Sequence, residues 1–408
     1  LGGAMSGTEV AYNPFLPGHA EDPYPQYEAM REHDPVHLNM FEVWMAFGYA
    51  EVRAMLRDQS LSVEDAKMHP TAMTEWVLQE MGDAADMGNR SMLNVDPPAH
   101  TRLRRLVSKA FTPRMVERLR SRVERLVDQT LEAAAEAGRM ELMDDLAFPL
   151  PFAVITDLLG MPPADTTELR RLSGLVVRSL EPVADGETLR EIAAAGRSLR
   201  EMIAGAIEWK RARMTDDLLS ALIAAEDEGD KLSPAELAEQ VALLYLAGHE
   251  TTVNLIGNGV LALLRHPDQM ELLRADPGLD ASAVDEILRY DSPVQMSRRV
   301  VLRETSLGGK TVEPGGLVVL ALASANRDPL KWGAGADRLD VRRPDAGDHV
   351  SFGGGHHYCL GASLARLEGQ VALGRLARRF TRVEQAGDIA YNGRLNLRGL
   401  SRLPLAVG

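Results

Sequence analysis

The chain has 408 residues, of which 45% are hydrophobic and 25% charged, and its formal net charge is −14. This composition is typical of a globular protein with ample core material, and the acidic balance argues against nucleic acid as a partner. No run of 18 apolar residues occurs, so we expect no membrane span. The N-terminus lacks the basic and apolar regions of a signal peptide. We therefore expect residues 1–4 to be a cloning remnant before Met5, and, with a single cysteine, a cytoplasmic location.

The first third of the chain predicts a strand pair followed by helices. Apolar residues alternate over 35–47 as in paired strands, ending with Met40 in the first and Phe47 in the second. A short helix is expected at 49–56. The methionine-rich segment 60–95 has no clean period, and we interpret it as a long loop with a short helix that covers a pocket, with core packing as the alternative. Thr112 and Pro113 predict the start of a helix that ends before Gly138.

The middle of the chain predicts one unusually long helix. Shorter helices are expected around 151–160, 165–180 and 187–213. Ser233, Pro234 and Glu236 then form a capping box with proline at the first helical position. The apolar pattern continues to Arg265, which predicts a helix of about 48 Å. Because this helix is apolar nearly all round near 243–246, we expect it to cross the middle of the protein.

The last third predicts a helix at 281–290, a β-rich stretch at 299–323 with turns at 308–309 and 314–316, and an irregular segment that leads to a helix at 362–380. No repeats or linkers interrupt the chain. The predicted fold class is therefore mainly α with a minor β region, arranged as a single domain over residues 1–408 around the long central helix.

The only cysteine, Cys359, lies between glycines in the run Phe352 to Gly361, just before the last predicted helix. The N-terminus of that helix would favour the thiolate, the form that binds metals. The alternative is an inert buried cysteine. Gly353 permits a tight turn near the sulfur, and Phe352 would shield it from solvent. This run resembles the haem-ligand loop of the cytochrome P-450 family, the haem-thiolate monooxygenases.

The resemblance implies that Cys359 ligates the iron of haem b and that His357 hydrogen-bonds a haem propionate, with a solvent-exposed loop histidine as the alternative. His100 and Arg104, four residues apart on one helix face, would also bind propionates. So would Arg299, although a register error of one residue would exchange it with Arg298. Taken singly, each of these residues could also be an ordinary surface charge.

A second motif, Ala247 to Thr252, lies in the middle of the long helix. Because glycine and threonine are poor helix formers, we expect Gly248 and Thr251 to open a bulge for O₂ and water. The resemblance identifies this run as the oxygen-activation motif, in which Ala247 and Gly248 lie over the haem, Thr251 hydrogen-bonds at the oxygen site, and Glu250 relays protons from solvent. The alternative is a threonine hydroxyl bonded to its own i−4 carbonyl.

A third motif, Glu286 and Arg289, matches the E-x-x-R element of the family, where the resemblance adds Arg338 as the third member of a structural network. Alone, the pair would be a weak surface ion pair. Leu339 stands where family members usually carry phenylalanine, so the chain departs from the family's pattern beside Arg338.

Together these motifs imply an enzyme that uses O₂ to hydroxylate or epoxidise a hydrophobic small molecule, with electrons from NAD(P)H through ferredoxin reductase and ferredoxin. Between Asp96 and Arg125 there are nine arginines or lysines against three acids, which would form the docking face for an acidic ferredoxin or simply a solvated surface. The expected pocket lining is apolar and includes the 68–92 segment, Leu243, Leu244, Val294, Met296 and the Asn396–Leu397 turn.

Three other functions remain open. A haem-thiolate sensor or carrier would keep Cys359 but would not need Glu250 and Thr251. A peroxide-driven variant is possible, although the intact acid–threonine pair favours O₂ and a redox partner. A zinc site built from Cys359 with His349, His356 or His357 would crowd its ligands into one loop.

Overall fold

The structure, a computed structural model, describes residues 11–39, 41–70, 72–82, 90–162, 166–182, 185–224, 226–227 and 230–408. Residues 1–4, Met5, Met40 and part of the methionine-rich segment, residues 83–89, lie outside the described ranges. Among the described residues, no helix combines the length and the apolar character that crossing a bilayer requires.

The helices of four or more residues are α1 (Tyr24–His33), α2 (Tyr49–Arg57), α3 (Ala72–Met81), α4 (Ala99–Ala110), α5 (Pro113–Ala137), the π-helix η3 (Met143–Ala147), α6 (Pro149–Leu159), α7 (Thr166–Val176), the 3-10 helix η4 (Val177–Leu180), α8 (Gly186–Arg211), α9 (Leu218–Ala224), α10 (Pro234–Arg265), α11 (Pro267–Ala275), α12 (Asp280–Tyr290), α13 (Leu322–Ala325), α14 (Pro329–Trp332) and α15 (Ala362–Arg379). Shorter 3-10 turns lie at Asp65–Lys67, Pro277–Leu279, Gly333–Gly335, Ala346–Asp348 and Gly355–His357.

The strands are β1 (Val36–Leu38), β2 (Trp44–Ala46), β3 (Leu61–Ser62), β4 (Arg139–Glu141), β5 (Glu226–Asp227), β6 (Asp230–Lys231), β7 (Met296–Val301), β8 (Thr305–Leu307), β9 (Lys310–Val312), β10 (Leu317–Ala321), β11 (Val383–Gln385), β12 (Ala390–Tyr391), β13 (Leu400–Arg402) and β14 (Pro404–Val407). The predicted fold class, mainly helical with a minor β region, is confirmed.

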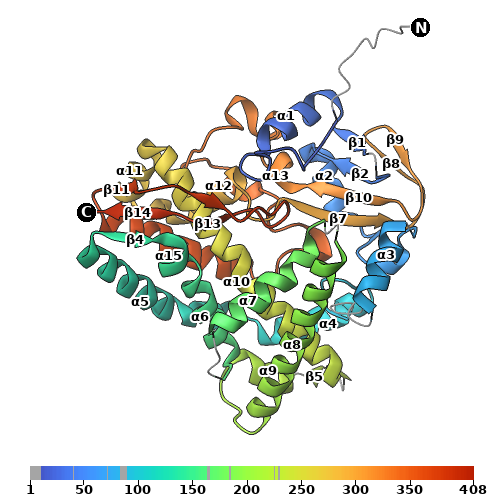
Figure 1. Ribbon diagram of the computed structural model, residues 1–408, viewed down its shortest axis with the longest axis horizontal. Helices are drawn as coiled ribbons and strands as arrows, with labels where there is room; N and C mark the ends of the chain where they lie inside the picture. Colours follow the sequence, from blue (N-terminus) through green and yellow to red (C-terminus); the bar gives the residue numbers. More distant parts are fainter. Residues whose placement is uncertain are drawn as a thin grey trace.

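The long helix α10 is the centre of the fold. Its capping box is formed as predicted: Ser233 Oγ accepts from Glu236 N, and the Glu236 carboxylate accepts from Ser233 N. Figure 1 shows α10 crossing the middle of the molecule, with α5 and α15 to one side. It packs against α6, α8, α12 and α15, and its buried side chains, among them Leu255, Ile256 and Val260, belong to the largest apolar core.

A second, smaller core lies under the five-stranded sheet, whose order is β1-β2-β10-β7-β3. β2 pairs with β10 in parallel, and the other neighbours are antiparallel. Strand β7 carries the two candidate arginines into this sheet, with Arg298 opposite Val319 and Arg299 opposite Val318. The sheet lies at the upper right of Figure 1, away from α5. The remaining strands form a three-stranded sheet, β11-β14-β4, and short hairpins.

The segment 60–95 is more regular than we predicted. It contains β3, a 3-10 turn at Asp65–Lys67 and the helix α3, where we expected a loop with one short helix. Met92 is buried in the main core, so this methionine fills the core, as the alternative interpretation held. Sequence periodicity did not reveal β3 because a two-residue strand depends on its partner β7, which is far away in the sequence.

Candidate functional site

The loop that carries Cys359 is shaped by two glycines in the left-handed region. Gly353 has φ +71° and Gly355 has φ +64°, conformations that side chains other than glycine's rarely adopt. A Cβ on Gly355 would also lie 2.6 Å from the carbonyl oxygen of Leu56. The loop closes where Cys359 N donates to the carbonyl of Phe352 at 2.9 Å. Helix α15 then begins at Ala362, so the cysteine precedes the helix N-terminus, as predicted.

The sulfur of Cys359 lies in a recess of the protein. The side chain has an exposed surface, yet protein surrounds it so closely that burial raises the pKa of the thiol. The pKa of the thiol is lowered by the backbone N–H of Gly361 and by the guanidinium groups of Arg104 and Arg366. These effects are smaller than the rise caused by burial. The Gly361 N–H belongs to the helix N-terminus and favours the thiolate, as expected, while desolvation of the charged form is the larger effect in the protein by itself.

Four basic side chains gather near this recess, and none forms an ion pair with a described carboxylate. His100 is buried on α4, neither of its ring nitrogens has a hydrogen-bond partner, and its ring centroid is 4.3 Å from that of His357. Burial, together with neighbouring cationic groups, lowers the pKa of His100 to about 4 and that of His357 to about 3, although Asp96 opposes both shifts. Burial also lowers the pKa of Arg104, while the charge of Cys359 raises it.

The two neighbouring arginines of β7 have different surroundings. Arg298 points to the surface, where Nη1 lies 2.7 Å from Asp65 Oδ1. Arg299 is buried, and among the described residues it donates only to Ser297 Oγ and the carbonyl of Arg298. Burial lowers the pKa of Arg299 to about 10, and Asp96 opposes this shift. A buried guanidinium without an anion is costly, so of the two residues Arg299 is the one that suits a bound carboxylate.

These residues fit a haem. A haem carries two carboxylates, for which His100, Arg104, Arg299 and His357 offer donors that no described acid uses. Cys359 offers a sulfur ligand within the electrostatic reach of Arg104. A zinc site finds no comparable support, because the described residues contain no group of three or more His, Cys, Asp or Glu side chains that could hold a metal ion.

The oxygen-activation motif lies in an uninterrupted stretch of α10. All residues from Ala247 to Thr252 are α-helical, and Thr251 Oγ1 donates to the carbonyl of Ala247 at 2.9 Å. The bulge that we expected is therefore absent, and the threonine makes the i−4 bond of the alternative interpretation. Ala247 is nevertheless exposed, whereas α10 is buried without interruption from Thr252 to Leu263. This small residue therefore borders an open space in the middle of the helix.

Gly248 serves helix packing. A Cβ on this residue would lie 3.0 Å from Ile155 Cδ1 of α6. Its missing side chain therefore lets α6 and α10 approach each other closely. The sequence motif alone did not reveal Ile155, because the contact joins helices about 90 residues apart in the chain.

Glu250 is held by an arginine that the sequence analysis missed. Arg394 Nη1 donates to Glu250 Oε1, and both side chains are largely buried. On the other side, His249 Nε2 lies 3.9 Å from Glu250 Oε2 and has no hydrogen-bond partner, while His249 Nδ1 donates to the carbonyl of Tyr245. Burial lowers the pKa of His249. Nothing near Arg394 in the sequence marks it, since it belongs to an irregular loop between β12 and β13.

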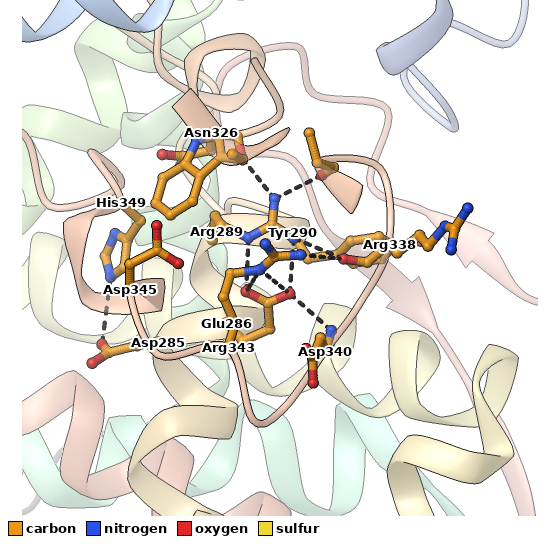
Figure 2. Close-up of polar contacts among 12 residues, drawn as sticks. Asp285, Glu286, Arg289, Tyr290, Asn326, Arg338, Asp340, Arg343, Asp345 and His349 are labelled. Carbon is orange, nitrogen blue, oxygen red and sulfur yellow. Dashed lines mark hydrogen bonds and ion pairs between the residues drawn. The ribbon is translucent and has the colours of Figure 1, made fainter. Parts of the chain in front are cut away.

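The E-x-x-R pair is buried and its third member is Arg343. Arg289 donates to both carboxylate oxygens of Glu286, at 2.7 and 2.8 Å, and Arg343 Nε donates to the same carboxylate from 3.1 and 3.2 Å. The prediction of Arg338 was wrong. It contributes only its backbone carbonyl, which accepts from Arg289 Nη2, and its side chain extends away from Glu286 (Figure 2).

Phe352 lies under a guanidinium. The Arg366 Cζ atom is 4.7 Å from the centroid of the Phe352 ring, and Arg366 Nε donates to Asp285 Oδ1 at 2.7 Å. His349 Nε2 lies 3.4 Å from the same carboxylate oxygen, and its ring is 5.3 Å from that of Phe352. The ring beside the cysteine loop is therefore held by α12 through Asp285 and by α15 through Arg366.

Comparison with known proteins gives the family. The profile of the family described as Cytochrome P450 matches residues 71–276 and 279–390. The chain is 41% identical to the vitamin D(3) 25-hydroxylase of Pseudonocardia autotrophica over 396 residues, 95% of this chain and 94% of the relative. It is 39% identical to the 6-deoxyerythronolide B hydroxylase of Saccharopolyspora erythraea, with 95% and 96% covered.

Solved structures agree. The crystal structure of CalO2 superposes with a TM-score of 0.88 at 35% identity and covers 98% of this chain and 99% of its own. Because the family profile and the full-length relatives agree with this fold, the chain belongs to the cytochrome P450 family of haem-dependent monooxygenases.

Proposed function

We propose that this enzyme oxidises a large apolar small molecule with O₂, and that the sulfur of Cys359 would hold the iron of its haem. When bound, the haem supplies the activation of O₂ and the insertion of one oxygen atom into substrate. In this proposal His100, Arg104, Arg299 and His357 bind the propionates. Phe352 and Gly353 shield and shape the thiolate loop, and Ala247 and Gly248 belong to the helix over the haem.

Thr251 and Glu250 are proposed to serve the oxygen side of the site. Their roles are hydrogen bonding by the Thr251 hydroxyl and proton supply by the Glu250 carboxylate. In the structure Thr251 Oγ1 donates to Ala247, so its lone pairs remain able to accept a further bond. The neighbouring exposed surface of Ala247 supports the placement of the oxygen site beside this turn of α10.

The observation that carries the proposal is the set of unpaired basic side chains around the only cysteine. The His100 ring lies tilted against that of His357, and the charge of Cys359 raises the pKa of Arg104. A guanidinium that is withdrawn from water without an anion weakens the fold, so the two arginines of this set, Arg104 and Arg299, indicate an anionic ligand there, for which the uncharged His100 and His357 offer further hydrogen-bond donors. Haem satisfies both features at once, because its two propionates would accept from the basic side chains and its iron would bind the thiolate.

The direct test is the optical spectrum of the dithionite-reduced holoenzyme under carbon monoxide. We expect a strongly red-shifted Soret band that Cys359→Ser abolishes while the neighbouring Tyr358→Phe retains it. A Cys359→Ser protein that keeps the shifted band would exclude Cys359 as the ligand. If the wild-type protein, supplemented with haem during expression, binds none, the whole proposal fails.

The proposed substrate is a medium or large hydrophobic compound, such as a terpenoid, polyketide or fatty acyl molecule. Relatives named for vitamin D3 and for 6-deoxyerythronolide B support this class, as do solved relatives in complex with myristic acid or corticosterone. Part of the predicted lining is instead buried in the protein: Leu244 and Leu397 have 8% and 4% of their surface exposed. A panel of such compounds, scored by the shift in haem spin state, would define the class.

We further propose that electrons arrive from NAD(P)H through a reductase and an acidic ferredoxin, which docks on the face formed by α4 and the start of α5. Arg105 and Lys109 of α4 are exposed and would attract an acidic partner. The face is less cationic than the sequence suggests, because several of its arginines form ion pairs with acids: Arg102 with Asp230 and Glu236, Arg118 with Asp216, Arg120 with Glu117, and Arg122 with Asp157.

Charge reversal tests this docking face. Arg105→Glu should slow reduction of the holoenzyme by a plant-type ferredoxin about tenfold at low salt and leave dithionite reduction unchanged, because only the protein partner senses the surface charge. Arg303→Glu, an exposed residue after β7, is the matched control and should reduce normally. Equal slowing by Arg105→Glu with both reductants would sink the docking proposal.

A further inference from the structure

The loop from Arg394 to Arg398 joins three parts of the molecule. Arg394 Nη1 donates to Glu250 of α10, and Arg394 Nη2 donates to the carbonyl of Gly174 in α7 at 3.3 Å. The bridge between Val294 and Leu397 ties the loop to the segment before β7. The side chains of Glu250 and Arg394 have only 14% and 17% of their surface exposed, so water screens this contact weakly.

Glu181, which follows η4, holds the backbone of the same loop. Its carboxylate accepts from three successive backbone N–H groups, those of Leu395 at 2.7 Å, Asn396 at 3.0 Å and Leu397 at 3.1 Å. Charge-assisted bonds of this kind are stronger than neutral ones, and successive N–H groups around one anion form a compact nest. The residue immediately before this nest is Arg394, so a shift of the nest would move the guanidinium.

α10 holds the other end of the loop. Asn254 Nδ2 donates to the carbonyl of Leu397, and Asn258 Nδ2 donates to that of Arg398, both at 3.2 Å. Asn254 lies one helical turn after Glu250, so the same helix carries the acid and one of the loop's anchors. The loop therefore cannot move relative to Glu250 unless bonds to α10, to Glu181 or to Gly174 break.

We propose that Arg394 and Glu181 are positioning residues for Glu250: Arg394 fixes the direction of the Glu250 carboxylate, and Glu181 fixes the loop that carries Arg394. The inference rests on the proposed role of Glu250 in proton supply. A carboxylate held by one guanidinium has a defined orientation, and displacement of a proton-transfer group by about 1 Å can slow a reaction by about 100-fold. His249, whose free Nε2 faces the second carboxylate oxygen, limits the space into which Glu250 could turn.

The consequence is measurable without a known substrate. When a plant-type ferredoxin and its reductase drive the holoenzyme with NADPH, O₂ is reduced either to hydrogen peroxide with two electrons and two protons, or to water with four electrons and four protons. Slower proton delivery favours the route that needs fewer protons. The ratio of NADPH to O₂ consumed, which is one for peroxide and two for water, therefore reports the supply of protons.

We expect Arg394→Gln to raise the peroxide yield several-fold and to increase the solvent deuterium isotope effect on NADPH oxidation. Arg394→Lys, which keeps a cation for Glu250, should restore part of the wild-type ratio. Glu181→Gln should change the ratio in the same direction and should also speed hydrogen exchange of the 395–397 amides about tenfold. Arg171→Gln and Glu168→Gln, an exposed pair on α7, are the matched controls and should behave as wild type.

Glu250→Gln separates this inference from the proposed function. If Glu250→Gln leaves the ratio and the isotope effect unchanged, Glu250 does not supply protons. The proposed role of Glu250 and the positioning inference then both fail, while the CO spectrum tests the haem-thiolate proposal separately. If Glu250→Gln changes them but Arg394→Gln and Glu181→Gln do not, the positioning roles are wrong and the role of Glu250 stands. If all variants show equal losses together with an altered carbon monoxide spectrum, the loop only maintains the fold, and the positioning inference is overturned.

Discussion

Glu286 illustrates how a single buried carboxylate organises its neighbours. It is fully buried, and it accepts from Arg289, from Arg343 and from the backbone N–H of Asp340. Three donors satisfy most of the lone pairs that desolvation would otherwise leave bare. The spacing of three predicted that Glu286 and Arg289 share a helix face, but only the resemblance to the family implied that the pair belongs to a structural network. The resemblance implied Arg338 as the third member, but Arg343 holds that place, because the irregular segment that carries both arginines has no local pattern to fix which one reaches Glu286.

This difference gives a prediction at the level of one side chain. Arg343→Ala should lower the free energy of unfolding by about 2 kcal/mol, because Glu286 loses one charged donor but keeps Arg289. Arg338→Ala should change it by less than about 0.5 kcal/mol, since the exposed side chain is lost and its carbonyl still accepts from Arg289. Urea unfolding of both holoproteins, followed by circular dichroism, measures the difference. Equal destabilisation by the two substitutions would show that Arg343 has no special part in the network.

The register of β7 is a second case that residue patterns could not decide. Arg298 and Arg299 are adjacent and chemically identical, and only the pairing of β7 with β10 shows which one faces inward. The shared placement of His100 and Arg104 was easier to predict, because a spacing of four on a predicted helix places both side chains on one face. Residues whose position follows from local geometry could therefore be predicted, whereas those that depend on a distant partner could not.

Among the elements, α10 was predictable at its ends and misjudged in its middle. The capping box fixes its start and the proline after His266 its end, and both are local signals. The expected bulge at Gly248 was inferred from helix propensity, which tertiary packing overrides here. Ile155 of α6 fills the space beside the glycine, and the contact stabilises a straight helix.

Because α6 and α10 lie so close at Gly248, adding a side chain at this position should destabilise the protein. Gly248→Ala should lower the free energy of unfolding by about 1–3 kcal/mol, because the new methyl overpacks against Ile155 and outweighs the better helix propensity of alanine. Ile155→Val in the same chain should recover part of that loss, since it removes the Cδ1 atom that lies 3.0 Å away. A double-mutant cycle from urea unfolding measures the coupling. Additive effects would mean that the two residues do not constrain each other.

Over the whole molecule, helix-rich regions could be predicted from sequence and long-range pairings could not. The 3.6-residue periodicity and the caps identified α5, α8 and α10 with small boundary errors. The parallel pairing of β2 with β10 joins segments more than 270 residues apart, and no local pattern encodes such a partner. The three hydrogen bonds that the Glu181 carboxylate accepts from the loop after Arg394 also join distant segments, and no local pattern predicts them.

A segment near the N-terminus and a loop near the C-terminus meet at one buried ion pair, which leads to a prediction for the whole fold. Arg398, in the loop before β13, pairs with Asp291 and donates to the carbonyls of Ala20 and Glu21, and Tyr24 Oη donates to Asp291 at 2.9 Å. The pair therefore fastens the N-terminal segment to the C-terminal loop.

Either Arg398→Met or Asp291→Leu alone should lower the free energy of unfolding by about 3–5 kcal/mol, because each leaves one buried charge without its partner. The double variant should be more stable than the sum of the two losses predicts, by about 1–3 kcal/mol, since no unpaired charge remains. Urea unfolding measures the cycle, and limited proteolysis should show earlier cleavage near residue 20 in both single variants. Arg402→Met, whose partner Glu141 is 3.9 Å away at the surface, is the control and should cost under about 1 kcal/mol. If the two single losses simply add, Arg398 and Asp291 act independently, and their ion pair does not fasten the N-terminal segment to the C-terminal loop.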